Sequence, residues 1–194
     1  MLKSLLMAAS EQPPFDPVSV LAEINRRFVA TVLPGNFASM FLGRWQPESR
    51  ELSWASAGHE PGILLTESGR LDQLVSTGLL LGIDPDAVWE LRSKTLADGD
   101  RVLLFSDGAT ETQSPDKELF GRERLTARFS QCSDVAPQAA LEQIRQVLNA
   151  HRVEGPLSDD LTLVVLQCGV ALPDTANTLT HSETTSPQVV EISE

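Results

Sequence analysis

Two almost wholly apolar runs, each bounded by aspartate, constrain this chain more than any other feature. Residues 103–111 read LLFSDGATE, and residues 158–166 read SDDLTLVVL. A carboxylate at the end of a buried strand is costly unless a cation or several hydrogen-bond donors meet it. Two such ends therefore indicate a shared site. The cation that best suits several carboxylates is a hard divalent metal ion.

The overall charge excludes some classes of partner. The chain has 194 residues, enough for one domain with a real core, and carries a formal net charge of -12. Nucleic acid and anionic membranes both require a basic surface, so neither is expected as a partner.

The opening residues 1–9 are too short to span a bilayer and are expected to be part of a helix. Cys132 and Cys168 form neither a zinc pattern nor a disulfide framework, which favours the cytoplasm.

Periodicity and turn residues predict an α+β domain. Asp16 and Pro17 begin a helix whose apolar stripe ends before Pro34. Alternation then predicts β-hairpins over residues 37–57, 63–75 and 89–105. Helices are expected over residues 121–129 and 137–151, and a last strand over residues 161–168. Helices would thus cover antiparallel strands, which are numerous enough for two stacked sheets.

The last part of the chain has a different composition. Residues 170–194 contain four acidic residues, no Lys or Arg, and many Ser and Thr, which predicts a disordered tail. Its removal is then expected to change the unfolding free energy by less than about 1 kcal/mol. The alternative is that residues 189–192 (VVEI) add an edge strand.

Each aspartate at the proposed site also has a purely structural explanation. Asp107 before Gly108 is typical of an Asx-turn that closes a strand. Asp159 and Asp160 could cap the turn before the following strand. Neighbours in an extended segment point to opposite sides, so only one of that pair should face a given metal ion. The two segments together are harder to explain by turns alone.

Five motifs in fixed order resemble bacterial SpoIIE/RsbU-type serine phosphatases, which belong to the metal-dependent protein phosphatase 2C superfamily. The motifs are residues 56–65 (SAGHEPGILL), 80–82 (LLG), 102–111 (VLLFSDGATE), 119–125 (LFGRERL) and 159–165 (DDLTLVV). The resemblance covers roughly residues 2–168. It implies a four-layer α-β-β-α sandwich of antiparallel sheets flanked by helices, with residues 1–169 as the C-terminal portion of the domain.

The resemblance also implies roles for the residues at the strand ends. Asp107 and Asp159 would be ligands of a dinuclear Mn²⁺ or Mg²⁺ centre that hydrolyses phosphoserine or phosphothreonine on a protein. Gly108 would leave room beside the metal ions. Asp160 would support the ligands by hydrogen bonding, and Thr162 would help to fix the turn.

His59 lies in the Gly-His pair of the first motif. The resemblance places it near the catalytic edge, where it could serve in proton transfer. The alternative is a turn histidine that orders the loop before Pro61.

Other classes of hydrolase do not fit the sequence. A serine hydrolase is not indicated, because Ser106 lacks the flanking glycines of a nucleophile elbow. A haloacid-dehalogenase phosphatase would need an Asp-x-Asp pair, which Asp107-Gly108-Ala109 does not provide.

The sequence departs from the family at its start. Members of the family carry two further motifs upstream: an Asp on an early strand, and an Asp-Gly followed by Gly-His-Gly. These motifs supply the carboxylate that bridges the metal ions, and this sequence contains neither of them. The chain is therefore expected either to be the C-terminal portion of a longer protein or to have lost the upstream half of the domain. In both cases its metal site would be incomplete, and no activity of its own is expected. The resemblance implies a phosphorylated anti-sigma-factor antagonist as substrate and an upstream receiver or sensor domain, and leaves a homodimer open. The alternative function is a phosphatase-like adaptor that binds a partner without catalysis.

Overall fold

The computed structural model describes residues 15–33, 35–152, 160–169 and 188–193, with only the backbone of the last segment. The chain forms two compact units. Unit 1 comprises Met1–His59 and Val75–Thr95, and unit 2 comprises Glu60–Leu74 and Leu96–Glu194. The helix expected over residues 1–9 lies outside the described residues.

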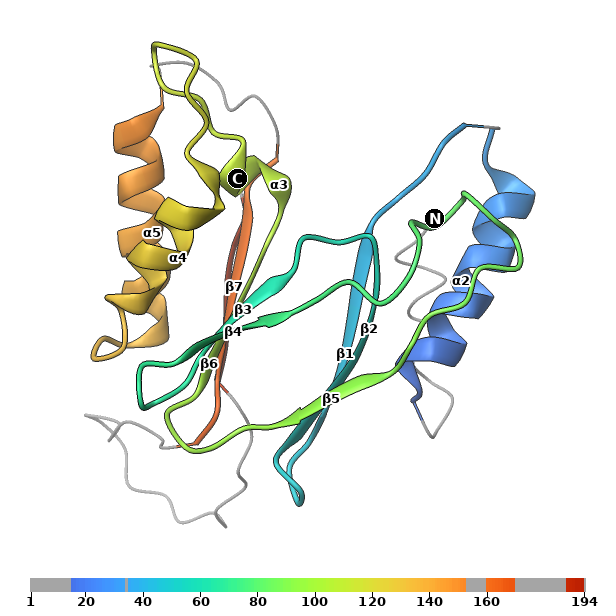
Figure 1. Ribbon diagram of the computed structural model, residues 1–194, viewed down its shortest axis with the longest axis horizontal. Helices are drawn as coiled ribbons and strands as arrows, with labels where there is room; N and C mark the ends of the chain where they lie inside the picture. Colours follow the sequence, from blue (N-terminus) through green and yellow to red (C-terminus); the bar gives the residue numbers. More distant parts are fainter. Residues whose placement is uncertain (1–14, 34, 153–159, 170–187, 194) are drawn as a thin grey trace. The chain divides into compact units, whose positions relative to one another are not determined.

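Unit 1 is a helix packed on a three-stranded antiparallel sheet. Helix α2 (Pro17–Thr31) begins where the sequence predicted, because the Asp16 carboxylate accepts a hydrogen bond from the Ser19 amide at 3.0 Å. The sheet order is β1-β2-β5, with strands β1 (Met40–Gln46), β2 (Glu51–Ala57) and β5 (Arg92–Thr95). Figure 1 shows α2 lying along β1 and β2. The apolar stripe of the helix packs against the buried face of the sheet in a core of Val20, Leu21, Ile24, Phe28, Leu42, Ala55, Ala57, Leu81 and Trp89.

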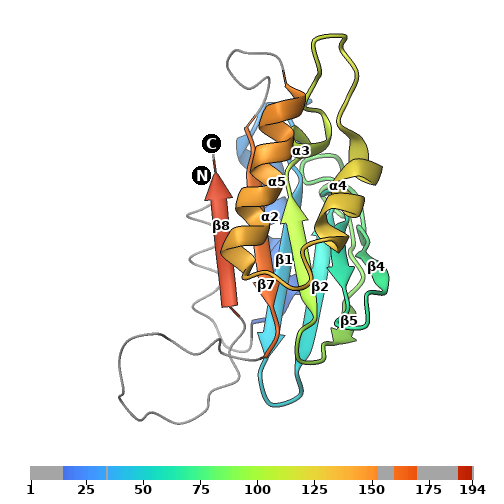
Figure 2. The ribbon, with the colours of Figure 1, turned by 90° about the vertical axis from the view of Figure 1, so that its left-hand side faces the viewer.

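Unit 2 is a five-stranded antiparallel sheet covered by helices. Its strands are β3 (Gly62–Leu65), β4 (Leu71–Leu74), β6 (Arg101–Phe105), β7 (Thr162–Gln167) and β8 (Gln188–Ser193), in the order β4-β3-β6-β7-β8. Its helices are α3 (Asp107–Thr110), α4 (Gly121–Ser130) and α5 (Pro137–His151). Figure 2 shows α4 and α5 in front of the sheet, with β8 at its edge.

The core of unit 2 explains why β6 and β7 are so apolar. Leu103, Phe105, Leu163 and Val165 are almost fully buried and pack with the apolar side chains of α4 and α5. Central strands covered by helices need apolar residues, since few of their side chains reach water. The predicted α+β class, with antiparallel sheets and flanking helices, is confirmed.

The third predicted hairpin is wrong. The segments at Arg92–Thr95 and Arg101–Phe105 both form strands, but they do not pair with each other. Strand β5 pairs with β2 in unit 1, whereas β6 pairs with β3 and β7 in unit 2. Strand β5 is largely exposed and suits a sheet edge, while β6 is buried and suits a sheet centre. Because of this difference in burial, β5 and β6 join different sheets, although the turn between them is short enough for a hairpin.

The tail prediction also needs correction at its end. Residues 188–193 form β8, which pairs with β7 from Thr162↔Ser193 to Gln167↔Gln188. The edge-strand alternative therefore holds for this segment. Residues 170–187 lie outside the described part of the chain, and their predicted disorder stays a prediction.

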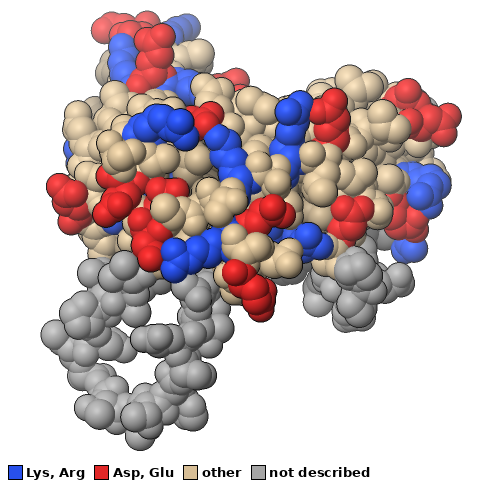
Figure 3. Space-filling model, turned by 60° about the horizontal axis from the view of Figure 1, so that its bottom comes forward, with Lys and Arg blue, Asp and Glu red and all other residues tan. Residues whose placement is uncertain are grey.

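Charged side chains are mixed rather than segregated on the face drawn in Figure 3, where basic and acidic residues alternate over short distances. Among the described residues, no helix is both long and apolar enough to cross a membrane.

Candidate metal centre

The end of β6 and the start of β7 lie side by side in unit 2. Phe105 pairs with Leu163 as the last step of the β6–β7 register. Beyond it, the Ser106 amide donates to the Thr162 carbonyl at 3.0 Å, and the Thr162 amide donates to Ser106 Oγ at 2.9 Å. The Ser106 hydroxyl in turn donates to the Asp160 carbonyl at 2.8 Å. One serine therefore ties two segments that are more than 50 residues apart in the sequence.

Asp107 is the first residue of the short helix α3, directly after this serine. Its side chain is exposed, and its Oδ1 accepts a hydrogen bond from the Gly108 amide at 3.0 Å. Gly108 is buried, and its carbonyl accepts a hydrogen bond from Thr112 Oγ1 at 2.7 Å. The structural alternative for Asp107 was a turn that closes the strand. The structure shows a single helical turn at this point, and the Asp107 carboxylate remains accessible.

The partner segment is described only in part. Asp160 is exposed and contributes its carbonyl to Ser106, while Thr162 contributes its backbone amide and carbonyl. Asp159, the second predicted metal ligand, lies outside the described residues. The structure thus brings Asp107, Gly108, Asp160 and Thr162 to one end of the five-stranded sheet.

His59 belongs to unit 1, at its boundary with unit 2 in the sequence. The preceding Gly58 has a φ of 61°, and a Cβ there would lie 2.6 Å from Leu80 Cδ2, so only glycine fits. The His59 ring is half-buried and meets the Phe41 ring edge-on, with centroids 6.3 Å apart. A constrained backbone therefore places this histidine at a defined position within unit 1.

Arg122 at the start of α4 was not singled out from the sequence. Its Nη2 donates to the Pro61 carbonyl at 2.7 Å, and its Nη1 lies 3.3 Å from Glu60 Oε2. Its guanidinium carbon lies 5.4 Å from the centroid of the Phe105 ring. The arginine thus contacts both the segment before β3 and the residue that precedes Ser106. The one sequence signal for a role of Arg122 is its place in the motif LFGRERL, which resembles a motif of the SpoIIE/RsbU-type phosphatases.

Burial lowers the pKa of the Arg122 guanidinium, and the carboxylate of Glu60 opposes this shift. The side chain remains charged at neutral pH, since an arginine starts from so high a value. It therefore acts as a fixed cation with planar donors, which suits the positioning of a loop.

The oxygen ligands available at this end of the sheet are of the type that Mn²⁺ and Mg²⁺ prefer. Within the part of the chain that the structure describes, no three His, Cys, Asp or Glu side chains gather closely enough to hold a metal ion. Asp107 presents one exposed carboxylate of this type, and further oxygen donors would be needed to complete a ligand set.

Two curated proteins resemble the chain in sequence. "Protein IcfG" from Synechocystis sp. is 34% identical over 135 residues, which are 67% of this chain and 20% of that protein. "Phosphoserine phosphatase RsbU" from Bacillus subtilis is 30% identical over 161 residues, which are 78% of this chain and 45% of that protein. The chain therefore spans less than half the length of either relative.

Solved structures share the fold. The SiaA-PP2C domain of Pseudomonas aeruginosa matches with a TM-score of 0.75 at 18% identity, covering 86% of this chain and 67% of that one. The phosphatase domain of SpoIIE from Bacillus subtilis, with a fragment of its regulatory domain, matches with a TM-score of 0.70 at 18% identity, covering 86% of this chain and 48% of that one.

The family model described as "Stage II sporulation protein E (SpoIIE)" matches residues 1–169, which include both strand ends described above and all five sequence motifs. The chain therefore belongs to the SpoIIE family.

Proposed function

We propose that this chain is the C-terminal portion of the catalytic domain of a metal-dependent protein serine/threonine phosphatase. The observation that carries the proposal is the link made by Ser106, which holds Asp107 beside the segment of Asp160 at one end of the sheet. An exposed carboxylate at that position suits a metal-dependent hydrolase, whose metal ions need oxygen ligands.

In this proposal Asp107 and Asp159 bind Mn²⁺ or Mg²⁺, and Asp160 supports them. When bound, such ions lower the pKa of a coordinated water and neutralise the phosphate. The exposed carboxylate of Asp107 is held by the Gly108 amide on one oxygen, which orients the group. The single turn of α3 keeps this orientation without a long or mobile loop.

The remaining residues are proposed to have supporting roles. Arg122 holds Glu60 and Pro61, and so fixes the chain immediately after His59. His59 is proposed to move a proton during phosphate release, a role that histidine side chains often take in enzymes. Thr162 acts through its backbone, by closing the hydrogen-bond pair with Ser106.

The proposed substrate is a phosphorylated protein in the cytoplasm, and specifically an anti-sigma-factor antagonist. Support comes from the relative RsbU, which is called a phosphoserine phosphatase, and from a structural neighbour that joins RsbU and RsbW domains. An upstream receiver or sensor domain would control the activity. Both relatives are more than twice the length that this chain covers, which leaves room for such domains in them.

The test measures Mn²⁺-dependent phosphate release from a phosphoserine antagonist protein. The 194-residue chain and the full-length gene product that carries it are assayed side by side. We expect release by the full-length protein, no release by the 194-residue chain, and no release by full-length Asp107→Asn. Asp86→Asn is a matched control, because Asp86 is exposed and lies in unit 1.

Each outcome separates the alternatives. If the full-length protein binds its partner but never releases phosphate, the adaptor function replaces the phosphatase. If Asp107→Asn retains full turnover, the proposed role of this carboxylate is wrong. Activity in the 194-residue chain itself would mean that it holds a complete set of ligands.

A further inference from the structure

The loop that follows α3 forms a short hairpin over residues 112–120. At its base, the Phe120 amide donates to the Thr112 carbonyl at 2.8 Å, and both residues are buried. Thr112 Oγ1 also donates to the carbonyl of Gly108, the residue after Asp107. Figure 1 shows the hairpin projecting beyond α3. The hairpin is therefore attached directly to the turn that carries the proposed metal ligand.

Two helices hold the outer part of the hairpin. His151 Nε2, at the end of α5, donates to the Glu118 carbonyl at 2.9 Å, since a carbonyl can only accept. Arg124 Nη1, on α4, donates to the Leu119 carbonyl at 3.0 Å. Within the hairpin, the Ser114 amide donates to the same Glu118 carbonyl at 2.9 Å. The backbone of this exposed loop is thus fixed in advance, so that binding through it would cost little ordering entropy.

Lys117 lies at the tip of the hairpin in a conformation that lysine seldom adopts. Its φ is 64°, in the left-handed region where a side chain crowds its own backbone and glycine fits without that cost. Its amide donates to the Ser114 carbonyl at 2.9 Å, which closes the turn. Residues held in such conformations concentrate at functional sites. A lysine at this position therefore indicates a use for its side chain.

The ammonium group of Lys117 is available to a partner. Its side chain is exposed and forms no ion pair with any other residue that the structure describes. Asp116 and Glu118 flank it in the sequence, and Glu118 is already paired with Arg124. In a chain of net charge -12, a cation on a fixed backbone next to the proposed metal end favours an acidic partner there.

The hairpin tip is close enough to Asp107 to meet a protein bound there. From Asp107 to Ser114 the chain extends at most about 18 Å, at ~1.5 Å per residue in the helical turn and ~3.4 Å per residue beyond it. The turn to Lys117 adds up to about 7 Å. A folded substrate of about 100 residues has a radius of gyration of ~13 Å, so its surface covers this distance. A small phosphate ester does not.

We propose that this hairpin docks the phosphoprotein substrate, and that Lys117 selects it by pairing with a carboxylate on the surface of the substrate near its phosphoserine. The inference rests on the proposed function, because it requires the phosphate to be held at the end of the sheet that carries Asp107. The fixed backbone places the ammonium group before the substrate arrives, and the ion pair adds affinity for proteins with an acidic surface beside the phosphate.

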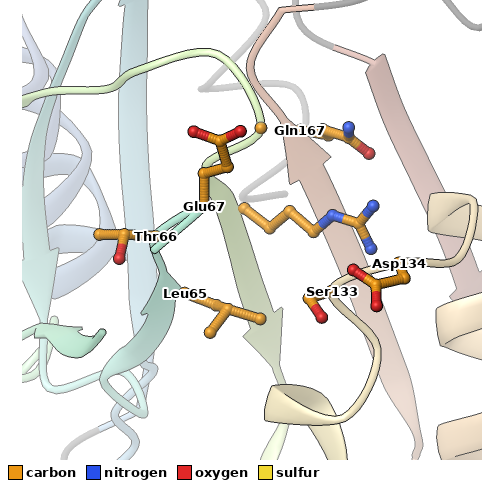
Figure 4. Close-up of a pocket in the computed structure, with 8 residues that line it drawn as sticks. Leu65, Thr66, Glu67, Ser133, Asp134 and Gln167 are labelled. Carbon is orange, nitrogen blue, oxygen red and sulfur yellow. The ribbon is translucent and has the colours of Figure 1, made fainter. Parts of the chain in front are cut away.

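The opposite end of unit 2 supplies a matched control residue. Arg70 is exposed and ends the turn that follows β3. This turn borders a cavity, which Figure 4 shows with Glu67 and Asp134 among its lining residues. It lies beside Arg101 at the start of β6, whereas Asp107 follows the end of that strand. A change of charge at Arg70 therefore alters the net charge of the chain without touching the hairpin.

The test uses the full-length protein and two measurements. The first is Mn²⁺-dependent phosphate release from the phosphorylated antagonist protein and from p-nitrophenyl phosphate. The second is the affinity for the phosphorylated antagonist, measured by calorimetry with EDTA in place of the metal so that no turnover occurs.

Lys117→Gly should raise the KM for the phosphoprotein about fivefold or more, with the change in KM rather than in kcat. Its affinity in EDTA, and its preference for the phosphoprotein over p-nitrophenyl phosphate, should fall by a similar factor. Lys117→Glu should have a larger effect, because it replaces attraction by repulsion. Arg70→Glu should change neither quantity by more than about twofold. Urea unfolding should show wild-type stability for Lys117→Gly, because glycine suits this backbone conformation.

The results separate this inference from the proposed function. Wild-type preference and affinity in Lys117→Gly would overturn the inference, and so would losses in Arg70→Glu as large as those in Lys117→Glu. If the wild-type protein releases phosphate from neither substrate, the proposed function fails. In that case a loss of affinity in Lys117→Gly would still support docking through the hairpin, and an unchanged affinity would overturn it.

Discussion

Ser106 and Thr162 are joined by reciprocal hydrogen bonds, at 3.0 Å from the Ser106 amide to the Thr162 carbonyl and at 2.9 Å from the Thr162 amide to Ser106 Oγ. The backbone bond extends the β6–β7 ladder by one step, and the side-chain bond closes it. The same hydroxyl also donates to the Asp160 carbonyl, so one oxygen atom makes two of the three hydrogen bonds described between these segments.

Ser106→Ala should therefore lower the unfolding free energy by about 1–2 kcal/mol, since it removes one acceptor and one donor at a partly buried site. Urea unfolding of the 194-residue chain measures this loss. Ser130→Ala is the control, because Ser130 Oγ donates only to Ala127 within its own helix, and we expect a change of less than about 0.5 kcal/mol. Equal effects of the two substitutions would show that Ser106 does not hold the strand ends together.

Arg122→Lys should destabilise unit 2 although it keeps the positive charge. A lysine cannot reach Glu60 and the Pro61 carbonyl with a planar fork, nor stack on Phe105 in the same way. We expect the unfolding free energy to fall by about 1 kcal/mol. The decrease is small because both partners of the ion pair are partly solvated. If the full-length protein is a phosphatase, the turnover number should fall more than the affinity for substrate.

Arg124→Lys is the matched control for this experiment. Arg124 pairs with Glu118 at the surface and donates to the Leu119 carbonyl, and exposed ion pairs of this kind contribute little to stability. An effect as large as that of Arg122→Lys would contradict a specific role for Arg122.

Asp16→Ala should remove the N-cap of α2 and lower stability by about 1 kcal/mol at pH 7. The hydrogen bond from Ser19 lowers the pKa of Asp16 below its ordinary value of 3.8. A carboxyl group with a depressed pKa contributes stability that is present above its unfolded-state value and is lost as the pH falls through its folded-state value. The difference between wild type and Asp16→Ala should therefore shrink between pH 5 and pH 2, as urea unfolding at several pH values can measure. A difference that stays constant down to pH 2 would exclude the ionised cap.

Truncation after Gly169 should destabilise unit 2, contrary to the expectation from composition. Six residues of β8 pair with β7, so their removal turns β7 from an interior strand into an exposed edge. We expect a loss of more than about 1 kcal/mol in thermal or urea unfolding. Replacement of residues 170–187 by a Gly/Ser linker of equal length keeps β8, and should change stability by much less. If both variants lose the same stability, pairing of β8 is not the cause.

The sequence by itself determined the features that depend on near neighbours. The cap at Asp16, the apolar stripe of α2 and the hairpins β1–β2 and β3–β4 follow from residues within a few positions of one another. Local propensity and periodicity act over that range, so these elements could be predicted. The aspartates at the strand ends were also evident, because their position beside apolar runs is a local pattern.

The tertiary structure alone decided the features that depend on the choice of a distant partner. It separated β5 from β6 into different sheets, added β8 to β7, and brought Ser106 to Asp160. It also made Gln167 the cross-strand partner of Arg101. Many pairings satisfy the same local pattern, and only the burial of apolar faces in a complete core selects among them. For this reason the fold class could be predicted from the sequence, whereas the sheet order and the contacts of Arg122 could not.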